Sequence, residues 1–235
     1  MHSLKTKKVC IIDLDIGQRI SDLLMGLESR IISNVVDVLT NRCKLNSALI
    51  KDKNNDLYLL LPAAIDKRPR HVKSEEMRRL LIKMRNEFDY IIIDYPTGIG
   101  EGFESALKGA DKAIVIIKPD TFSIRWSDAI IVALQKQFNI ASQLLLINQL
   151  KPDLVEKGIM LDIDAIKEIF PVEVIGLIPW DFDLYMESLA YGLPVVKRKN
   201  LNLSIIDNFN RIARRLLDED IPIDLSIDLG IKKSR

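Results

Sequence analysis

The chain has few of the features that mark an exported or membrane-spanning protein. It contains two cysteines, Cys10 in an apolar segment and Cys43 in a polar turn, without the spacing of a metal site. No apolar run approaches the ~18 residues that cross a bilayer. Asp13 and Asp15 interrupt the first apolar segment too early for a signal peptide. The sequence therefore predicts a cytoplasmic protein.

The chain also has almost no net charge. Its 34 basic and 33 acidic residues leave a formal charge of +1, so no global field attracts nucleic acid or a membrane. Two local basic runs, residues 67–73 and 197–199, contain no interleaved aromatic side chains. We interpret them as solvated loops, with binding patches as the alternative. We expect no nucleic-acid partner.

Apolar strands alternate with helices along nearly the whole chain. The length of 235 residues and the 48% of hydrophobic residues suit one α/β domain. The expected strands are residues 9–14, 57–61, 90–94, 112–117, 143–147 and 173–178, and the expected helices are residues 33–40, 44–50, 74–88, 103–107, 123–138, 163–170, 184–190 and 203–217. Repeated strand–helix units predict a doubly wound, mostly parallel sheet with helices on both faces.

Polar residues end several of these predicted strands. Asp94 ends a strand with no other polar member, and Asp13 ends the first strand with Asp15 on the same face. Because parallel strands share an orientation, we expect these carboxylates at one edge of the sheet, with Asn148 and Asp181 at the ends of later strands. In the alternative interpretation, the aspartates only cap turns and the helices that follow.

Several short motifs, in order along the chain, carry a family resemblance. They are Val9–Gly17, Asp22–Gly26, Ala48–Asp52, Asp94–Ile99, Ser123–Arg125 with Ser127 and Asp128, Gly176–Pro179 and Tyr191–Val196. Together they resemble the MinD/ParA family of ATPases, and within it the branch that determines the division septum site. The resemblance extends to about Leu217. It implies a nucleotide-hydrolase domain over residues 1–217, of the type with a deviant phosphate loop.

The resemblance implies a role for each aspartate at the predicted edge. Asp15 matches the switch aspartate that positions the attacking water, and Asp13 matches its neighbour beside the magnesium ion. Asp94 matches the Walker B carboxylate, which holds hydrated magnesium. The implied cofactors are ATP and Mg²⁺. Phosphoryl transfer of this kind needs positioned water and charge neutralisation more than covalent chemistry.

The resemblance also implies base contacts and partners. Asn148 and the turn of Pro179, Trp180 and Asp181 fall where the family contacts adenine. The implied assembly is an ATP-dependent homodimer that works with a MinC-like division inhibitor and a MinE- or DivIVA-like regulator. The implied location is cytoplasmic, with peripheral contact at the inner face of the cell membrane.

The chain departs from the family in its phosphate loop. The family carries this loop on a strand and helix before the position of Lys8, and no G-x-x-x-x-G-K-[ST] pattern occurs in residues 1–235. We expect an N-terminally truncated domain that hydrolyses no ATP by itself, as from a split gene. The alternative is a non-hydrolysing scaffold that pairs with an intact paralogue. A DNA-bound partition factor is disfavoured by the neutral charge.

Two more departures concern the surface and the carboxyl-terminal end. Ile20 replaces the usual Asn, and Trp126 replaces an acid in the helix that meets MinC in the family. Residues 218–235 alternate with period two and contain Pro222, whereas the family ends in a basic amphipathic membrane helix. We expect this tail to be extended or disordered and not to bind anionic vesicles.

Overall fold

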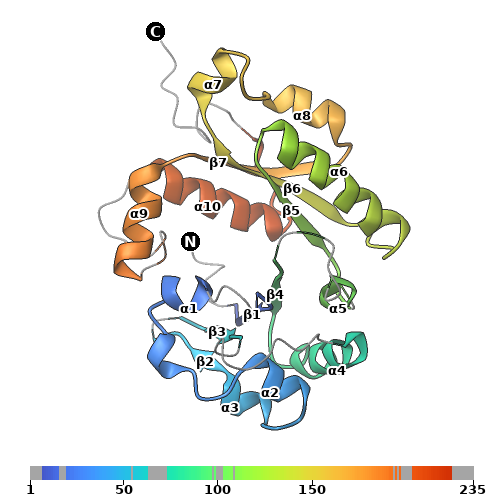
Figure 1. Cartoon of the computed structure of the whole chain (residues 1–235), viewed down its shortest axis with the longest axis vertical. Helices are drawn as coiled ribbons and strands as arrows, with labels where there is room; N and C mark the ends of the chain where they lie inside the picture. Colours follow the sequence, from blue (N-terminus) through green and yellow to red (C-terminus); the bar gives the residue numbers. More distant parts are fainter. Residues whose placement is uncertain are drawn as a thin grey trace. The chain divides into compact units, whose positions relative to one another are not determined.

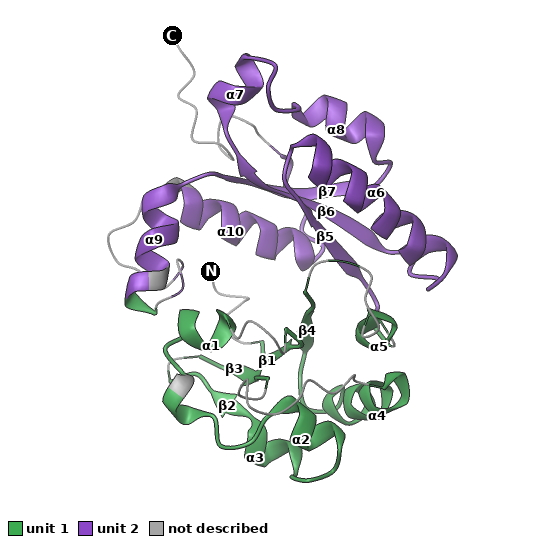
Figure 2. Cartoon of the chain, viewed as in Figure 1, with its two compact units in different colours: residues 1–110, 191–193 green, residues 111–190, 194–235 purple. Residues whose placement is uncertain are grey.

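The computed structural model describes residues 7–15, 20–53, 55–62, 73–96, 98, 103–107, 109–192, 194, 196 and 203–223. The chain forms two compact units, residues 1–110 with 191–193 and residues 111–190 with 194–235 (Figure 2). Each unit has its own sheet and its own helices. Residues 224–235 of the predicted extended tail lie outside the described residues. So do both basic runs, apart from Lys73.

The sheet of unit 1 has β1 at an inner position. Its strands are β1 (Val9–Asp13), β2 (Ile50–Lys51), β3 (Leu57–Leu60) and β4 (Tyr90–Asp94), in the order β2-β3-β1-β4. β1 runs parallel to β3 and to β4, whereas β2 pairs with β3 antiparallel. Cys10 and Ile12 of β1 are fully buried. The predicted parallel arrangement is confirmed for the strands that carry Asp13 and Asp94.

Helices cover one face of this sheet (Figure 1). They are α2 (Val35–Leu39), α3 (Leu45–Ala48), α4 (Ser74–Met84) and α5 (Phe103–Leu107), and α1 (Ile20–Leu24) and the short helix η2 (Glu28–Arg30) follow β1 in the chain. Met77, Leu80, Leu81 and Met84 form the buried stripe of α4, as the helical spacing predicts. α4 begins at the predicted residue, Ser74, but ends at Met84, four residues before the predicted end. Its N-cap is Lys73, whose backbone N–H donates to Glu76.

Unit 2 is built on three parallel strands. β5 (Ala113–Ile117), β6 (Gln143–Leu150) and β7 (Glu173–Pro179) lie in the order β5-β6-β7. The helices are α6 (Thr121–Lys136), α7 (Pro152–Glu156), α8 (Ile163–Ile169), α9 (Phe182–Tyr191) and α10 (Leu203–Leu216). α6 and α8 lie on one face of this sheet and α10 on the other (Figure 1). A Cβ on Gly176 of β7 would overlap Ile212 of α10, so this helix packs closely.

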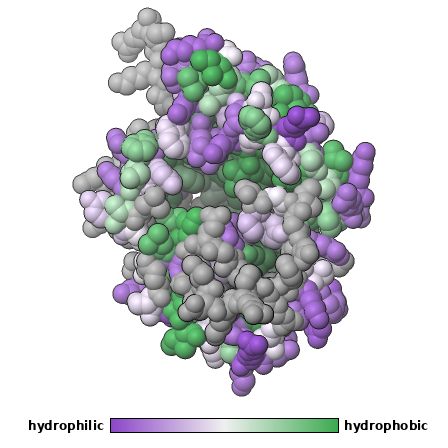
Figure 3. Space-filling view, viewed as in Figure 1, coloured by the Kyte–Doolittle hydropathy of each residue, from purple (hydrophilic) through white to green (hydrophobic). Residues whose placement is uncertain are grey.

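β4 and β5 are edge strands in the described part of the chain. β4 pairs only with β1, and β5 pairs only with β6. Ile92 of β4 is 50% exposed and Ile116 of β5 is 60% exposed. Figure 3 shows apolar side chains, in green, at several places on one face of the molecule. The alternation of strand and helix is as predicted, but these two strands do not pair with each other, and the strands form two sheets.

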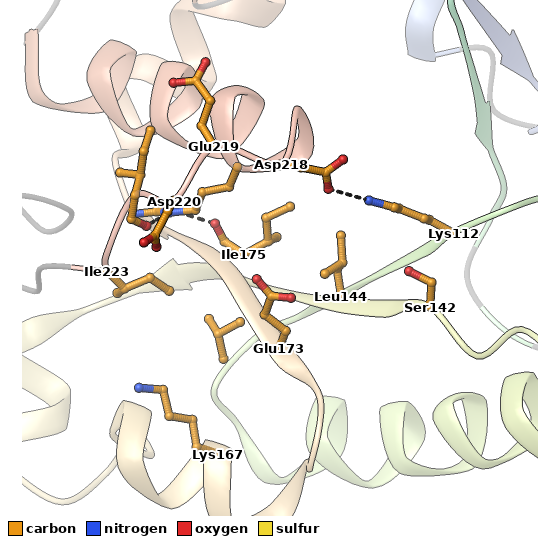
Figure 4. Close-up of a pocket in the computed structure, with 13 residues that line it drawn as sticks. Lys112, Ser142, Leu144, Lys167, Glu173, Ile175, Asp218, Glu219, Asp220 and Ile223 are labelled. Atoms are coloured by element: carbon orange, nitrogen blue, oxygen red, sulfur yellow. Dashed lines mark hydrogen bonds and ion pairs between the residues drawn. The ribbon is translucent and has the colours of Figure 1, made fainter.

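Arg215 of α10 holds the segment that follows this helix. Its guanidinium donates to the carbonyl oxygens of Ile175, Ile221 and Pro222 at 3.0, 2.8 and 2.9 Å. Residues 219–223 form neither helix nor strand. Beside them, at the amino ends of β5–β7, lies a cavity of about 620 Å³, with an ion pair between Lys112 and Asp218 (Figure 4).

No described helix is long and apolar enough to cross a membrane.

Candidate functional site

Asp13 and Asp94 lie side by side at the carboxyl ends of β1 and β4. They are register partners in the parallel pairing, and the N–H of Leu14 donates to the Asp94 carbonyl oxygen at 2.9 Å. Both strands reach this edge because their apolar runs end at the same register position. Ligands of open α/β sheets bind at the carboxyl ends of the strands. The structure thus brings the two aspartates together where the sequence predicted a site.

Asp13 is a buried acid held by short polar contacts. It is 1% exposed, its Oδ1 accepts a hydrogen bond from the Asp15 N–H at 2.7 Å, and its carboxylate is hydrogen-bonded to Ser21. Burial raises the pKa of Asp13, the Ser21 and Asp15 bonds lower it, and the charges of Asp15 and Asp22 raise it further. Asp13 therefore accepts a hydrogen bond in the turn that follows β1, as the alternative interpretation expects, and it also lies at the predicted edge of the sheet.

Asp94 shares this negative environment. Partial desolvation raises its pKa most, followed by the charges of Asp13 and Asp15, although Asp94 is exposed at the end of an edge strand. Three carboxylates therefore act on one another at the ends of two strands, and a bound cation would relieve their repulsion. The alternative role of Asp94 as a helix cap concerns residues 99–102, which lie outside the described residues.

The donor set suits one kind of metal ion. Carboxylate oxygens are hard ligands, and Mg²⁺ is usually held by one or two carboxylates, with water and phosphate oxygens completing an octahedron. Asp13 and Asp94 supply two such groups. Within the described residues, no group of three or more His, Cys, Asp or Glu side chains is arranged to hold a metal by itself. The site fits a hydrated magnesium ion and does not resemble an all-protein cage.

In unit 2, the remaining predicted site residues lie near the carboxyl ends of β6 and β7. Leu150 is the register partner of Pro179, and the N–H of Trp180 donates to the Leu150 carbonyl oxygen at 2.9 Å. The prediction that β6 ends before Asn148 was wrong. The strand continues through an irregularity in which the Gln149 N–H donates to Asn148 Oδ1 and Gln149 adopts a φ of 59°.

Trp180 belongs to an aromatic group that sequence reasoning did not find. Its ring centroid lies 6.4 Å from that of Phe182 and 6.2 Å from that of Tyr185, and the Lys151 Nζ lies 5.1 Å from its centre. Asp181 Oδ1 accepts a hydrogen bond from the Leu184 N–H in the first turn of α9. The aromatic residues at positions 180, 182 and 185 could have indicated this group, because 182 and 185 share a helix face.

The α6 helix presents an aromatic surface. Asp120 caps the helix by accepting bonds from the N–H groups of Phe122 and Ser123, so α6 begins two residues earlier than predicted. Phe122 is 80% exposed and Trp126, one turn later, is 63% exposed. The two rings stand on one face of the helix, where their exposure needs an explanation.

Residues 2–145 match a family model described as an AAA domain. The chain is 38% identical over 220 residues to the septum site-determining protein MinD of Bacillus subtilis, covering 93% of this chain and 81% of that protein. It is 38% identical over 216 residues to MinD of Synechocystis, covering 92% and 80%.

Solved structures give the same result. The structure titled MinC:MinD cell division protein complex, from Aquifex aeolicus, superposes with a TM-score of 0.83 at 33% identity, covering 93% of this chain and 87% of that chain. MinD of Pyrococcus horikoshii, solved with Mg-ADP, has a TM-score of 0.78 at 20% identity, covering 92% and 87%, which shows the fold alone. From the identity and coverage of these matches, we conclude that the chain belongs to the MinD family of septum site-determining proteins.

Proposed function

We propose that this chain acts in division septum site selection as a MinD-type protein that works with a MinC-like inhibitor. The observation that carries the proposal is the Asp13 and Asp94 pair at the carboxyl ends of two parallel strands, in a chain with the family resemblance reported above. A pair of acids at this position suits a magnesium nucleotide.

Each aspartate has a chemical task in this proposal. Asp94 and Asp13 hold the hydrated magnesium ion, and their mutual repulsion falls when it is bound. Asp15 lies beside them, with its backbone N–H fixed on Asp13, and its carboxylate orients the attacking water. Magnesium supplies charge neutralisation to the phosphates when bound. A Mg-ADP-bound relative supports this cofactor.

The adenine base would lie at the ends of β6 and β7. Asn148, Pro179, Trp180 and Asp181 are the proposed contacts, and they share one edge of the unit 2 sheet. The exposed rings of Phe182 and Tyr185 extend the apolar surface around Trp180. A flat aromatic surface with a few polar groups at its rim suits a purine.

ATP binding of this kind needs a loop that holds the phosphates. Residues 1–235 contain no G-x-x-x-x-G-K-[ST] pattern that would supply it. We propose that this chain hydrolyses no ATP by itself and that a strand carrying the loop pairs with an exposed edge. The unpaired edges of β4 and β5 and the exposed Ile92 and Ile116 support this proposal. A non-hydrolysing scaffold that pairs with an intact paralogue is the second candidate, favoured by the same sequence observation.

The aromatic face of α6 is the proposed surface for the MinC-like partner. The family resemblance implies contact with MinC on this helix, and a relative was solved as a MinC:MinD complex. Phe122 and Trp126 would act as apolar anchors there, since aromatic residues dominate the energetics of protein interfaces. An ATP-dependent homodimer, a MinE- or DivIVA-like regulator and peripheral membrane contact complete the proposal by family resemblance.

Association with a MinC relative tests the proposed function. The chain, supplied with a family phosphate-loop fragment and Mg-ATP, is expected to co-elute with MinC, and Trp126→Ser is expected to abolish co-elution. Ile159→Ser is the matched control, because Ile159 is also an exposed apolar residue, with 70% of it accessible, but lies outside α6. Co-elution that survives Trp126→Ser argues against this surface. If the wild-type chain does not co-elute with MinC, the result argues against the septum-site assignment.

A further inference from the structure

Backbone hydrogen bonds close the end of α1. The N–H of Gly26 donates to the Leu23 carbonyl oxygen at 3.1 Å, and the N–H of Leu27 donates to the Asp22 carbonyl oxygen at 2.8 Å. Gly26 has a φ of 61°, and the three observations together describe a Schellman ending. With five residues, α1 is too short to be stable without such contacts.

Gly192 packs against this helix end within unit 1. Its φ is 55°, and a Cβ there would lie 3.0 Å from the Leu23 carbonyl oxygen and 3.5 Å from Gly26 Cα. From the opposite side, a Cβ on Gly26 would lie 3.4 Å from the Gly192 carbonyl oxygen. The Leu23 oxygen accepts the bond that closes α1. A side chain at position 192 would therefore press on the atom that ends the helix.

α1 in turn carries groups that act on Asp13. The Ser21 hydroxyl, in the first turn of α1, is hydrogen-bonded to the Asp13 carboxylate. Asp22 is 2% exposed and lies close enough for its charge to act on Asp13. A shift of α1 would change both contacts. The position of the Asp13 carboxylate thus depends on where α1 is held.

We propose that Gly192 is a positioning residue for the aspartate site, acting through α1 and Ser21 on Asp13. The proposal rests on the proposed function, in which Asp13 lies beside the magnesium ion. Gly192 directly follows α9 in the chain, and Gly192, α1 and Asp13 all lie in unit 1.

Amide hydrogen exchange and NMR of Gly192→Ala test the positioning role. We expect exchange at Gly26 and Leu27 to become about tenfold faster and the amide proton of Asp15, which donates to Asp13, to change its chemical shift. The matched control is Gly158→Ala. Gly158 has a φ of 66° but no atom within 4 Å of an added Cβ, so it carries the backbone strain without the contact.

Three outcomes decide the proposal. Faster exchange limited to the end of α1, with an altered Asp15 signal in Gly192→Ala only, supports it. Unchanged exchange at Gly26 and Leu27, or equally faster exchange at the buried amides of Cys10 and Ile12, overturns it, since the latter indicates general destabilisation.

A second variant tests the last step without touching the turn. Ser21→Ala is expected to shift the Asp15 amide signal while leaving exchange at Gly26 and Leu27 unchanged, and an unshifted signal overturns the proposal. None of these measurements needs a nucleotide. A failure of the proposed function would appear separately, as the absence of magnesium-dependent nucleotide binding by the wild-type protein.

Discussion

Asp13 and Asp94 are register partners at the ends of two neighbouring parallel strands, and the backbone N–H of the residue after Asp13 donates to the Asp94 carbonyl oxygen. This pairing places two acids side by side without any loop to position them. A strand ladder is more rigid than a loop, so the carboxylates keep their separation as ligands arrive. The two acids destabilise the folded chain at neutral pH, because desolvation and neighbouring negative charges raise the pKa of both carboxyl groups.

Removing the charge of Asp13 should therefore stabilise the protein at neutral pH. Burial raises the pKa of Asp13, so the folded chain binds this proton more tightly than the unfolded chain. Stability is then highest below the ordinary pKa of an aspartate and falls as pH rises through the raised pKa. Asp13→Asn should raise the free energy of unfolding by on the order of 1 kcal/mol at about pH 7 and change it little at about pH 3.

Urea unfolding at the two pH values measures this difference. Asn retains an oxygen that can accept the Asp15 N–H, so the change removes mainly the charge. Asp153→Asn is the control, because this side chain is 67% exposed on α7 and should show no such pH dependence. A destabilised Asp13→Asn protein at neutral pH would show that the acid is held by favourable contacts that outweigh its burial.

Arg215 should anchor the segment after α10. Its guanidinium donates to three carbonyl oxygens, including that of Ile175 in β7. Arg215→Ala removes this donor from Ile175 and Ile221, whereas Pro222 keeps its bond from Arg211. We expect a loss of about 2 kcal/mol in the free energy of unfolding and faster proteolysis within residues 219–223.

The neighbouring arginine provides the comparison. Arg214 pairs with Glu219 on the surface, with both side chains more than a third exposed, so Arg214→Ala should cost less than about 1 kcal/mol. Urea unfolding and limited proteolysis of the two variants give the result. Equal effects would mean that the bonds of Arg215 to the backbone add nothing beyond a surface ion pair.

The sequence predicted the strands that carry the site because their apolar runs are uninterrupted. The runs before Asp13 and Asp94 indicated buried parallel strands. Both strands are parallel and end at the expected carboxylate, but β4 is an edge strand with Tyr90 and Ile92 exposed. Local features without such a pattern were missed. The short helix α7 begins at Pro152 and contains no buried residue. Its sequence therefore lacks the apolar periodicity from which a helix is predicted.

Other differences arise from backbone geometry that residue types do not reveal. The positive φ of Gln149 lets β6 continue past Asn148, although an asparagine usually favours a turn. The contact between Lys151 and Trp180 joins residues of two strand ends, which only the fold brings together. The sequence predicted a single sheet, whereas the described strands form two sheets.

ATP turnover with and without a separate phosphate-loop fragment tests the central claim most directly. The purified chain should hydrolyse no ATP above background, and the mixture should hydrolyse ATP only with magnesium. Asp15→Ala should abolish this turnover, whereas Asp56→Ala, an exposed acid of unit 1, should retain it. Turnover by the chain without the fragment that disappears with Asp15→Ala would contradict the account, because the aspartates would then act without the loop that we propose they need.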